Sequence, residues 1–266
     1  MEYPKEKTRT STCMGPEMPD KKKLLSRSPE VRSGLFLRLT PEQSAQWDKV
    51  LQAGVRAQQL VSGAVAVGGT AAALYAAHRL SLDTDHLLSE LETNFDRVLE
   101  TLHSSPGWKT VRVQPPVLIL GSLDDVPVGY RQARRKETIE IATLDTPHGP
   151  LTVPTVGELL GMKAYLAYSR HATRDYLDFA ALTTCMKEEE VLQSLLKLDD
   201  QYGHLQVASV RLEVAKTLAK PEPFDLRATD LATYKALAYP WQDWNHVQQI
   251  CRDVGLALAE RIVETP

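Results

Sequence analysis

Two carboxylates separated by a single residue, Asp83 and Asp85, are the part of this sequence best suited to chemistry. On a β-strand, alternate side chains leave the same face, so the two would be about 6.6 Å apart along the chain. Carboxylate oxygens at this spacing can hold one or two divalent cations beside a polyphosphate. An isolated Asp-x-Asp pair is nevertheless more often a solvated strand edge than a metal site, so its neighbours decide the interpretation.

A glycine pair, Gly68-Gly69, precedes these acids and is followed by Thr70. Two glycines allow a sharp turn and a close approach of the backbone to a ligand. A helix that begins at Thr70, with this residue as its cap, would offer free N–H groups and the positive end of its dipole to a phosphate. The sequence therefore predicts a short buried strand, a Gly-Gly turn, a helix, and a second short strand that carries both acids.

Other elements must hold this unit in place. Thr40 and Gln43 form a capping box that predicts a helix to about Val61. Apolar residues between Glu90 and His103 recur with helical spacing, which predicts an amphipathic helix packed on a sheet. After it, four short β-like runs are expected at Val111–Val113, Val117–Leu120, Ile139–Leu144 and Leu151–Val153.

The basic run 131–136 falls between two of these runs. It is compatible with phosphate or RNA binding, although a solvated hairpin face is the favoured interpretation. Glu137 and Glu140 lie at or on the strand that follows. Either would supply a third metal carboxylate, and an exposed strand acid is an equally good interpretation.

The last part of the chain is predicted to be helical, from a second capping box at Thr155 and Glu158. Lys163 lies among apolar residues without a partner on its own helix, which is typical of a snorkelling lysine or of one that binds an anion. Thr173 is expected to cap a further helix, on which Arg174 and Asp178 have the spacing of an exposed ion pair.

The composition fits a globular protein of 266 residues, with 43% hydrophobic and 24% charged residues. A net charge of -3 argues against a protein whose whole surface is basic and binds nucleic acid. Cys13, Cys185 and Cys251 lack metal-binding spacing and fit a reducing compartment. No secretory signal is visible, and the uncharged run Ala57–Ala77 is better explained as a buried strand, turn and helix than as a membrane span, so we expect a cytoplasmic protein.

Taken in order, these residues resemble the AbiEii/AbiGii nucleotidyltransferase toxins of bacterial abortive-infection and toxin–antitoxin systems. The resemblance covers roughly residues 60 to 185 and rests on the Gly-Gly-Thr turn, the segment from His78 to Asp85, Lys163, and the run Arg170-x-x-x-Arg174-Asp175-Tyr176-Leu177-Asp178. It implies an α+β, polymerase-beta-like fold, in which a mixed sheet flanked by helices is followed by a helical C-terminal region. The expected division is a leader at 1–33 without fixed structure, a core at 34–154, and a helical region at 155–266 that completes the active site.

The resemblance also implies roles for single residues. Gly68, Gly69 and Thr70 would bind the nucleotide, Asp83 and Asp85 would bind Mg²⁺ or Mn²⁺, Lys163 would face the phosphates, and Asp175 would be a later catalytic acid. Arg174 and Asp178 would brace the site, with Arg174 next to the nucleotide, and Ser81 would orient the acidic strand. The sequence departs from the family in Thr70, where a serine is usual, in His86, where an apolar aromatic often follows the acids, and in lacking an evident third metal carboxylate.

The implied activity is metal-dependent transfer of a nucleoside monophosphate from an NTP to a hydroxyl of tRNA or protein by a phage-defence toxin with a cognate antitoxin. The sequence leaves two alternatives open. One is a non-catalytic protein of the same fold that binds a nucleotide or an antitoxin, and the other is a kinase-like enzyme that transfers the γ-phosphate.

Overall fold

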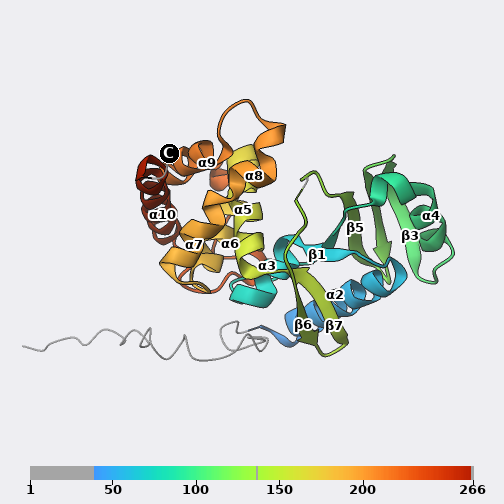
Figure 1. The fold of residues 1–266 in the computed structure, drawn as a ribbon. Helices are drawn as coiled ribbons and strands as arrows, with labels where there is room; N and C mark the ends of the chain where they lie inside the picture. The colour runs from blue at the N-terminus through green and yellow to red at the C-terminus, as the bar shows by residue number, and fades with distance from the viewer. Residues whose placement is uncertain (1–38, 136, 265–266) are drawn as a thin grey trace, which may run out of the picture. The chain divides into compact units, whose positions relative to one another are not determined.

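The computed structural model describes residues 39–135 and 137–264, and these belong to one compact unit. The predicted leader at 1–33 lies outside the described residues. The fold is α+β, as predicted: strands and helices alternate in the first part of the chain, and helices follow in the second (Figure 1).

A five-stranded sheet forms the centre of the first part. Its strands are β1 (Val65–Val67), β2 (Thr84–Leu88), β3 (Trp108–Gln114), β4 (Leu118–Leu123) and β5 (Val126–Gln132), in the spatial order β1-β2-β5-β4-β3. The pairing of β2 with β5 is parallel, whereas the other three pairings are antiparallel. A mixed sheet of this kind is what the resemblance implied.

Two helices cover one face of this sheet. α2 (Pro41–Leu60) begins at the predicted capping box of Thr40 and Gln43, and α4 (Leu91–His103) matches the predicted amphipathic helix. Both bury apolar side chains against β2, β4 and β5, with Tyr130 fully buried at their centre. Because side chains alternate along a strand, the β2 and β5 residues between these buried ones point to the opposite face.

The expectation of four strands in the region 109–153 was incomplete, because it missed β5. Asp124 and Asp125 both have left-handed backbone angles (φ 50° and 64°) and form the tight turn that joins β4 to β5. Arg131 and Gln132 therefore lie at the end of a central strand, on the β4–β5 hairpin, and both are partly exposed. The basic run departs from a solvated face at Arg135, whose buried side chain pairs with Glu158.

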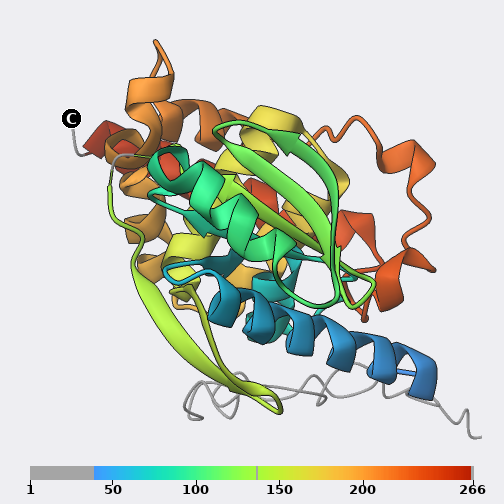
Figure 2. The ribbon, with the colours of Figure 1, turned by 90° about the vertical axis from the view of Figure 1, so that its right-hand side faces the viewer.

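A second, two-stranded sheet consists of β6 (Ile141–Thr146) and β7 (Gly149–Pro154). It lies along α2, where the side chain of Gln58 is hydrogen-bonded to the backbone of Thr152 (Figure 2). Glu137 and Glu140 both precede β6, and the exposed Glu140 carboxylate pairs with Lys197. Neither residue therefore lies on a strand next to the acidic pair.

Helices make up the remaining chain. They are α3 (Gly68–Ala76), α5 (Val156–Arg170), α6 (Thr173–Thr183), α7 (Glu188–Leu196), α8 (Leu198–Tyr202), α9 (Val210–Ala219) and α10 (Trp244–Glu264), with the 3-10 turns η1 (Gly203–Leu205), η2 (Leu226–Ala228) and η3 (Tyr234–Ala236). α3 packs on both β1 and α6, so it joins the sheet to the helices that follow (Figure 1).

Two predicted helix caps differ in detail. Thr155 does cap α5, but the carboxylate of Glu158 does not complete a box, because it is buried against Arg135 and Gln201. Thr173 does not cap α6: its own N–H and hydroxyl both donate to Asp225, a residue far along the chain. In both cases a long-range partner replaced the local one that the sequence suggested.

None of the helices in the described part of the chain combines the length and the apolar character that a membrane span requires.

Candidate functional site

The glycine turn lies where β1 passes directly into α3. Gly68 has φ +72°, a left-handed conformation that glycine adopts without steric cost, and α3 begins at this residue. The helix has no side-chain cap, so the N–H groups of its first turn have no partner within the helix. Thr70 does not cap the helix as predicted, because it lies within the first turn and its hydroxyl donates to the backbone oxygen of Asp83 (2.6 Å).

Gly69 is required for a different reason, which is the close approach of two side chains. A Cβ atom at this position would lie 2.7 Å from Nη2 of Arg79 and 2.8 Å from Oγ of Ser81. Both side chains are almost completely buried and have no room to move aside. The turn can therefore rest on Arg79 and Ser81 only if residue 69 has no side chain.

Asp83 and Asp85 both lie next to this turn, although only Asp85 belongs to β2. Asp83 immediately precedes the strand, is exposed, and accepts a hydrogen bond from the Ser81 hydroxyl (2.8 Å). The half-buried carboxylate of Asp85 lies close to Gly68 and over Gly129, the β5 residue opposite it. The structure thus brings the acidic pair, Ser81 and the glycine turn together.

Behind the turn, Asp178 forms the centre of a fully buried charge cluster. Its two oxygens accept hydrogen bonds from Nε and Nη2 of Arg79 (2.7 and 2.8 Å), and Oδ2 lies 2.7 Å from Nζ of Lys163. His78 Nε2 completes the cluster at 2.7 Å. Burial alone would raise the pKa of Asp178, but Arg79, Lys163 and His78 together hold this pKa well below its usual range.

The same cluster affects the protonation of His78. Burial lowers the pKa of His78, against the opposing effect of Asp178, so a neutral imidazole that donates from Nε2 fits the geometry. Lys163, on α5, also lies 3.4 Å from Asp175 of α6. Arg79 and Lys163 thus lie against the carboxyl groups of Asp178 and Asp175 in the interior.

Asp175 differs from Asp178 in one respect. Its side chain is buried, yet its Oδ2 atom has no hydrogen-bond partner in the described residues. A buried carboxylate oxygen without a partner is costly, and such atoms are often found where a substrate or water binds. Arg174 does not pair with Asp178 as expected: its side chain is exposed, and no ion pair joins the two in residues 39–135 and 137–264.

Sequence reasoning missed a further part of the site, residues 234–238, which we call the strap. The Lys235 carbonyl accepts from Leu80 N–H, and the Ala238 N–H donates to the His78 carbonyl, both at 2.8 Å. Lys235 and Ala236 have left-handed φ values of 46° and 51°, which are uncommon for residues with a side chain. Nothing in the local sequence signals this contact with a segment more than 150 residues away.

The strap adds positive charge near the acidic pair. Burial lowers the pKa of Lys235, as do Arg79 and Arg174, whereas Asp83 raises it. Lys235 is therefore close enough to Asp83 to sense its charge, yet it forms no ion pair with a carboxylate in the described part of the protein.

The acidic pair fits a divalent cation only as part of a larger ligand set. Within the described residues, no three metal-binding side chains come together. Two hard carboxylate oxygens nevertheless suit Mg²⁺, which commonly keeps several waters and takes further ligands from substrate phosphates. Asp83 and Asp85 are therefore the residues that would hold such an ion.

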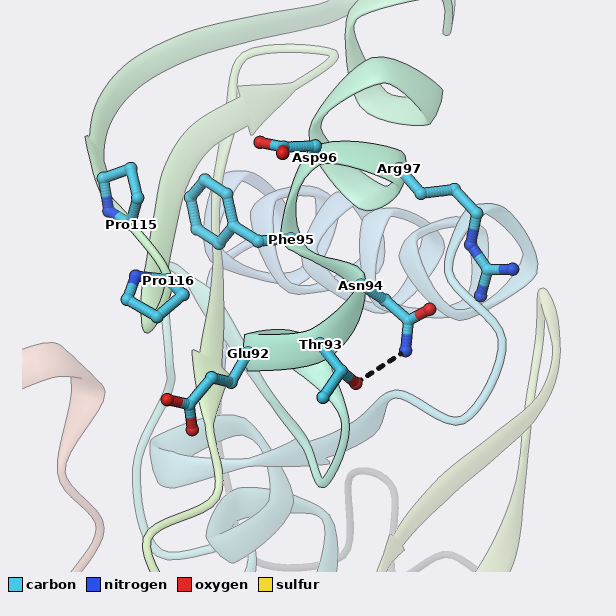
Figure 3. Close-up of a pocket in the computed structure, with 8 residues that line it drawn as sticks. All are labelled: Glu92, Thr93, Asn94, Phe95, Asp96, Arg97, Pro115 and Pro116. Atoms are coloured by element: carbon cyan, nitrogen blue, oxygen red, sulfur yellow. Dashed lines mark hydrogen bonds between the residues drawn. The ribbon is translucent and has the colours of Figure 1, made fainter.

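Two surface cavities do not include the acidic pair, although the second has Leu82, next to Asp83, in its wall. One, of about 270 Å³, is bounded by the first turns of α4 and by Pro115 and Pro116 (Figure 3). The other, of about 410 Å³, lies between α2 and the β4–β5 turn. Neither is lined by Asp83 or Asp85, and neither has the glycine turn and buried charge cluster that surround the acidic pair, so we assign the functional site to the acidic pair.

Comparison with known sequences gives a partial match. The sequence matches no described protein-family profile. It is 29% identical over 129 residues to the mycolic acid-containing lipids exporter MmpL11 of Mycolicibacterium smegmatis, and 31% identical over 138 residues to the heme uptake protein MmpL11 of Mycobacterium tuberculosis. These matches cover 47% and 50% of this chain, which spans only 13% of the length of either relative.

Comparison with solved structures covers most of the chain. The nucleotidyltransferase toxin MenT4 of Mycobacterium tuberculosis has a TM-score of 0.55 at 17% identity, over 82% of this chain and 84% of the toxin. A candidate nucleotidyltransferase from H. pylori has a TM-score of 0.53 at 14% identity, over 86% of this chain and 99% of its own. The chain therefore has the fold of these nucleotidyltransferases.

Proposed function

We propose that this protein is a metal-dependent nucleotidyltransferase that transfers a nucleoside monophosphate from an NTP to a hydroxyl group of RNA or protein. One observation supports this most: the glycine turn, the acidic pair and the buried cluster around Asp178 lie together in a fold that is similar to that of nucleotidyltransferases. Arg79 joins these parts, since its guanidinium lies against Gly69 on one side and binds Asp178 on the other.

In the proposed reaction, the acceptor oxygen attacks the α-phosphorus, the bond from that phosphorus to the β-phosphate oxygen breaks, and pyrophosphate leaves with the bonding electrons. Asp83 and Asp85 would hold the divalent cation, which when bound lowers the charge on the α-phosphate and stabilises the leaving group. The free N–H groups of Gly68, Gly69 and Thr70 at the start of α3 would bind the β- and γ-phosphates.

The proton of the acceptor hydroxyl needs a base, and we assign this role to Asp175. Its Oδ2 atom is the buried carboxylate oxygen without a partner, while Lys163 holds the other oxygen. Lys163 would in addition stabilise negative charge that develops on the phosphates. Ser81 orients Asp83, and Arg174 would contact the nucleotide from the exposed start of α6.

We further propose that the protein is a toxin that acts in the cytoplasm and is controlled by a cognate antitoxin. Support comes from the similarity to MenT4 and from the order of motifs that resembles the AbiEii/AbiGii proteins. Transfer RNA and protein hydroxyls are the two acceptor classes to test.

A second candidate is a non-catalytic member of the same fold that binds nucleotide or a partner. Two observations favour it: no third carboxylate joins the acidic pair in the described residues, and half of the sequence is similar to part of a protein described as a lipid exporter or a heme uptake protein. A kinase-like transfer of the γ-phosphate is the remaining alternative.

Product identity separates the three candidates. The pure protein is incubated with Mg²⁺, bulk tRNA and each NTP labelled with ³²P in the α- or the γ-position, beside the Asp83→Ala/Asp85→Ala variant. Nucleotidyl transfer moves the α-label to RNA or protein and releases pyrophosphate, and the variant loses both signals. Transfer of the γ-label alone would indicate a kinase, and nucleotide binding without any transfer would indicate the non-catalytic protein.

A further inference from the structure

Arg131 lies beside the acidic pair at a position where its charge is unexpected. Its Nε atom is 3.4 Å from Oδ1 of Asp85, and the two side chains are 42% and 33% exposed. This distance is that of an ion pair rather than of a short hydrogen bond, and a partly exposed pair of this kind is weak. The contact can therefore break when another ligand for Asp85 arrives.

The strand register explains why this position matters. In the parallel pair of β2 and β5, Asp85 lies opposite Gly129 and Leu87 lies opposite Arg131. Gly129 carries no side chain, and a Cβ atom there would collide with the Asp85 carboxylate. Residue 131 is consequently the first β5 side chain after the glycine that points to the same face as Asp85.

Residue 131 is therefore the position on β5, after Gly129, from which a third carboxylate could reach the metal. The chain has an arginine there, and a guanidinium repels a divalent cation instead of binding it. Glu137 and Glu140, which the sequence offered for this role, precede β6 in the other sheet.

We propose that Arg131 is the counter-ion of Asp85 in the metal-free protein and makes divalent-cation binding depend on bound nucleotide. Without nucleotide, the cation has only two protein carboxylates and must displace Arg131 from one of them. With nucleotide, the triphosphate supplies further oxygen ligands and offers Arg131 an anionic partner in place of Asp85. This inference rests on the proposed function, because it assumes that Asp83 and Asp85 hold the metal.

The test is direct measurement of Mn²⁺ affinity for the chain of 266 residues, by electron paramagnetic resonance of free Mn²⁺, with and without a non-hydrolysable NTP analogue. Without nucleotide, Arg131→Gln should bind Mn²⁺ about two- to fivefold more tightly than the wild type, since the competing ion pair is lost. Arg131→Glu supplies the third carboxylate and should bind on the order of tenfold more tightly. Arg131→Lys should resemble the wild type.

Arg112→Gln is the matched control, because Arg112 is an exposed arginine on the edge strand β3. The substitution removes the same charge as Arg131→Gln, but at a position outside the site. Circular dichroism verifies folding, and if Arg131→Glu fails to fold, the comparison of Arg131→Gln with Arg131→Lys decides. Equal Mn²⁺ affinity of the wild type, Arg131→Gln and Arg131→Glu, with weaker binding by Asp85→Asn, would overturn the role of Arg131 and leave the metal site intact. Absence of Mn²⁺ binding in every variant, even with the nucleotide analogue, would instead reject the proposed function.

Discussion

At the scale of single residues, the stability of the site depends on Asp178, whose carboxylate is fully buried and contacts Arg79, Lys163 and His78. Removing one partner from a buried ionic cluster leaves the other charges without compensation. Asp178 belongs to α6, Arg79 to the segment before β2, and Lys163 to α5. Loss of the Asp178 carboxylate would therefore destabilise both parts of the chain.

We expect Asp178→Asn to lower the free energy of unfolding by about 3–5 kcal/mol, the usual cost of breaking a buried ion pair. Urea denaturation followed by circular dichroism measures this change. The control Asp200→Asn removes an exposed carboxylate from α8 and should change stability by less than about 0.5 kcal/mol. Equal stability of the two variants would show that the cluster contributes nothing.

His86, a fully buried residue of β2, gives a second residue-scale prediction, which concerns pH. Its ring stacks on Tyr130 at 5.4 Å, and burial lowers its pKa to about 4, although backbone groups of Gly54 and Gly129 oppose this shift. In the unfolded chain a histidine has a pKa of about 6.5. Between these two values the unfolded chain binds a proton that the folded protein does not, so stability falls as the pH is lowered from about 6.5 to 4.

This loss should amount to about 3 kcal/mol and should be absent from His86→Phe, which retains the stacking ring. The measurement is the unfolding free energy of the wild type and the variant at several pH values. The slopes of this free energy against pH are compared, because the larger phenyl ring changes the absolute stability. His78 also has a lowered pKa and leaves a residual slope in the variant. His103→Gln, on the exposed end of α4, should keep the full slope, and a wild-type slope in His86→Phe would contradict the account.

Single residues could be predicted from the sequence where their chemistry is unusual for their position. Lys163 was singled out because a lysine among apolar residues is typical of snorkelling or of anion binding, and in the structure its Nζ atom contacts Asp178 and Asp175 instead. The partner of Asp178 was assigned wrongly, since Arg174 is its neighbour on the helix surface but Arg79 reaches it from outside the helix. Local spacing cannot reveal such a contact.

At the scale of elements, the unit from β1 to β2 could be predicted because each of its parts has a local signal. The strap has none, and its position depends on backbone hydrogen bonds to His78 and Leu80. β5 was missed because Gly129 interrupts its apolar residues and the strand ends in a basic run. Its true role follows only from pairing with β2.

The strap leads to a functional prediction. Lys235 lies within electrostatic reach of Asp83, and Arg174 lies nearby, so the two cations flank the place where the proposed triphosphate would bind. Lys235→Ala should weaken binding of a non-hydrolysable NTP analogue severalfold, measured by calorimetry.

Lys220→Ala is the control for this experiment, because Lys220 is an exposed lysine whose partner, Glu222, is also exposed. It should leave nucleotide affinity unchanged. If Lys235→Ala binds the analogue as tightly as the wild type and the control, the strap does not contribute to the nucleotide site.

At the scale of the whole molecule, two large apolar cores, with a small cluster of Val50, Ala53 and Val126 beside them, make up the interior of the described residues. One lies between α2, α4 and the larger sheet, and the other includes α3, β7 and the C-terminal helices. Strands in the first part and helices in the second could be predicted from their periodicity, whereas the fold with its mixed sheet was implied by the resemblance to a known family. How the two parts join could not be predicted, since the connection depends on Arg79, Asp178 and the strap rather than on any repeated pattern.

The most direct test of the site is a crystal structure of the protein with Mn²⁺ and a non-hydrolysable NTP analogue. We expect an anomalous manganese peak in contact with the carboxylates of Asp83 and Asp85, and the triphosphate at the N–H groups of Gly68 and Gly69. Manganese and nucleotide bound elsewhere, for instance in the cavity beside α4, would contradict the assignment of this site.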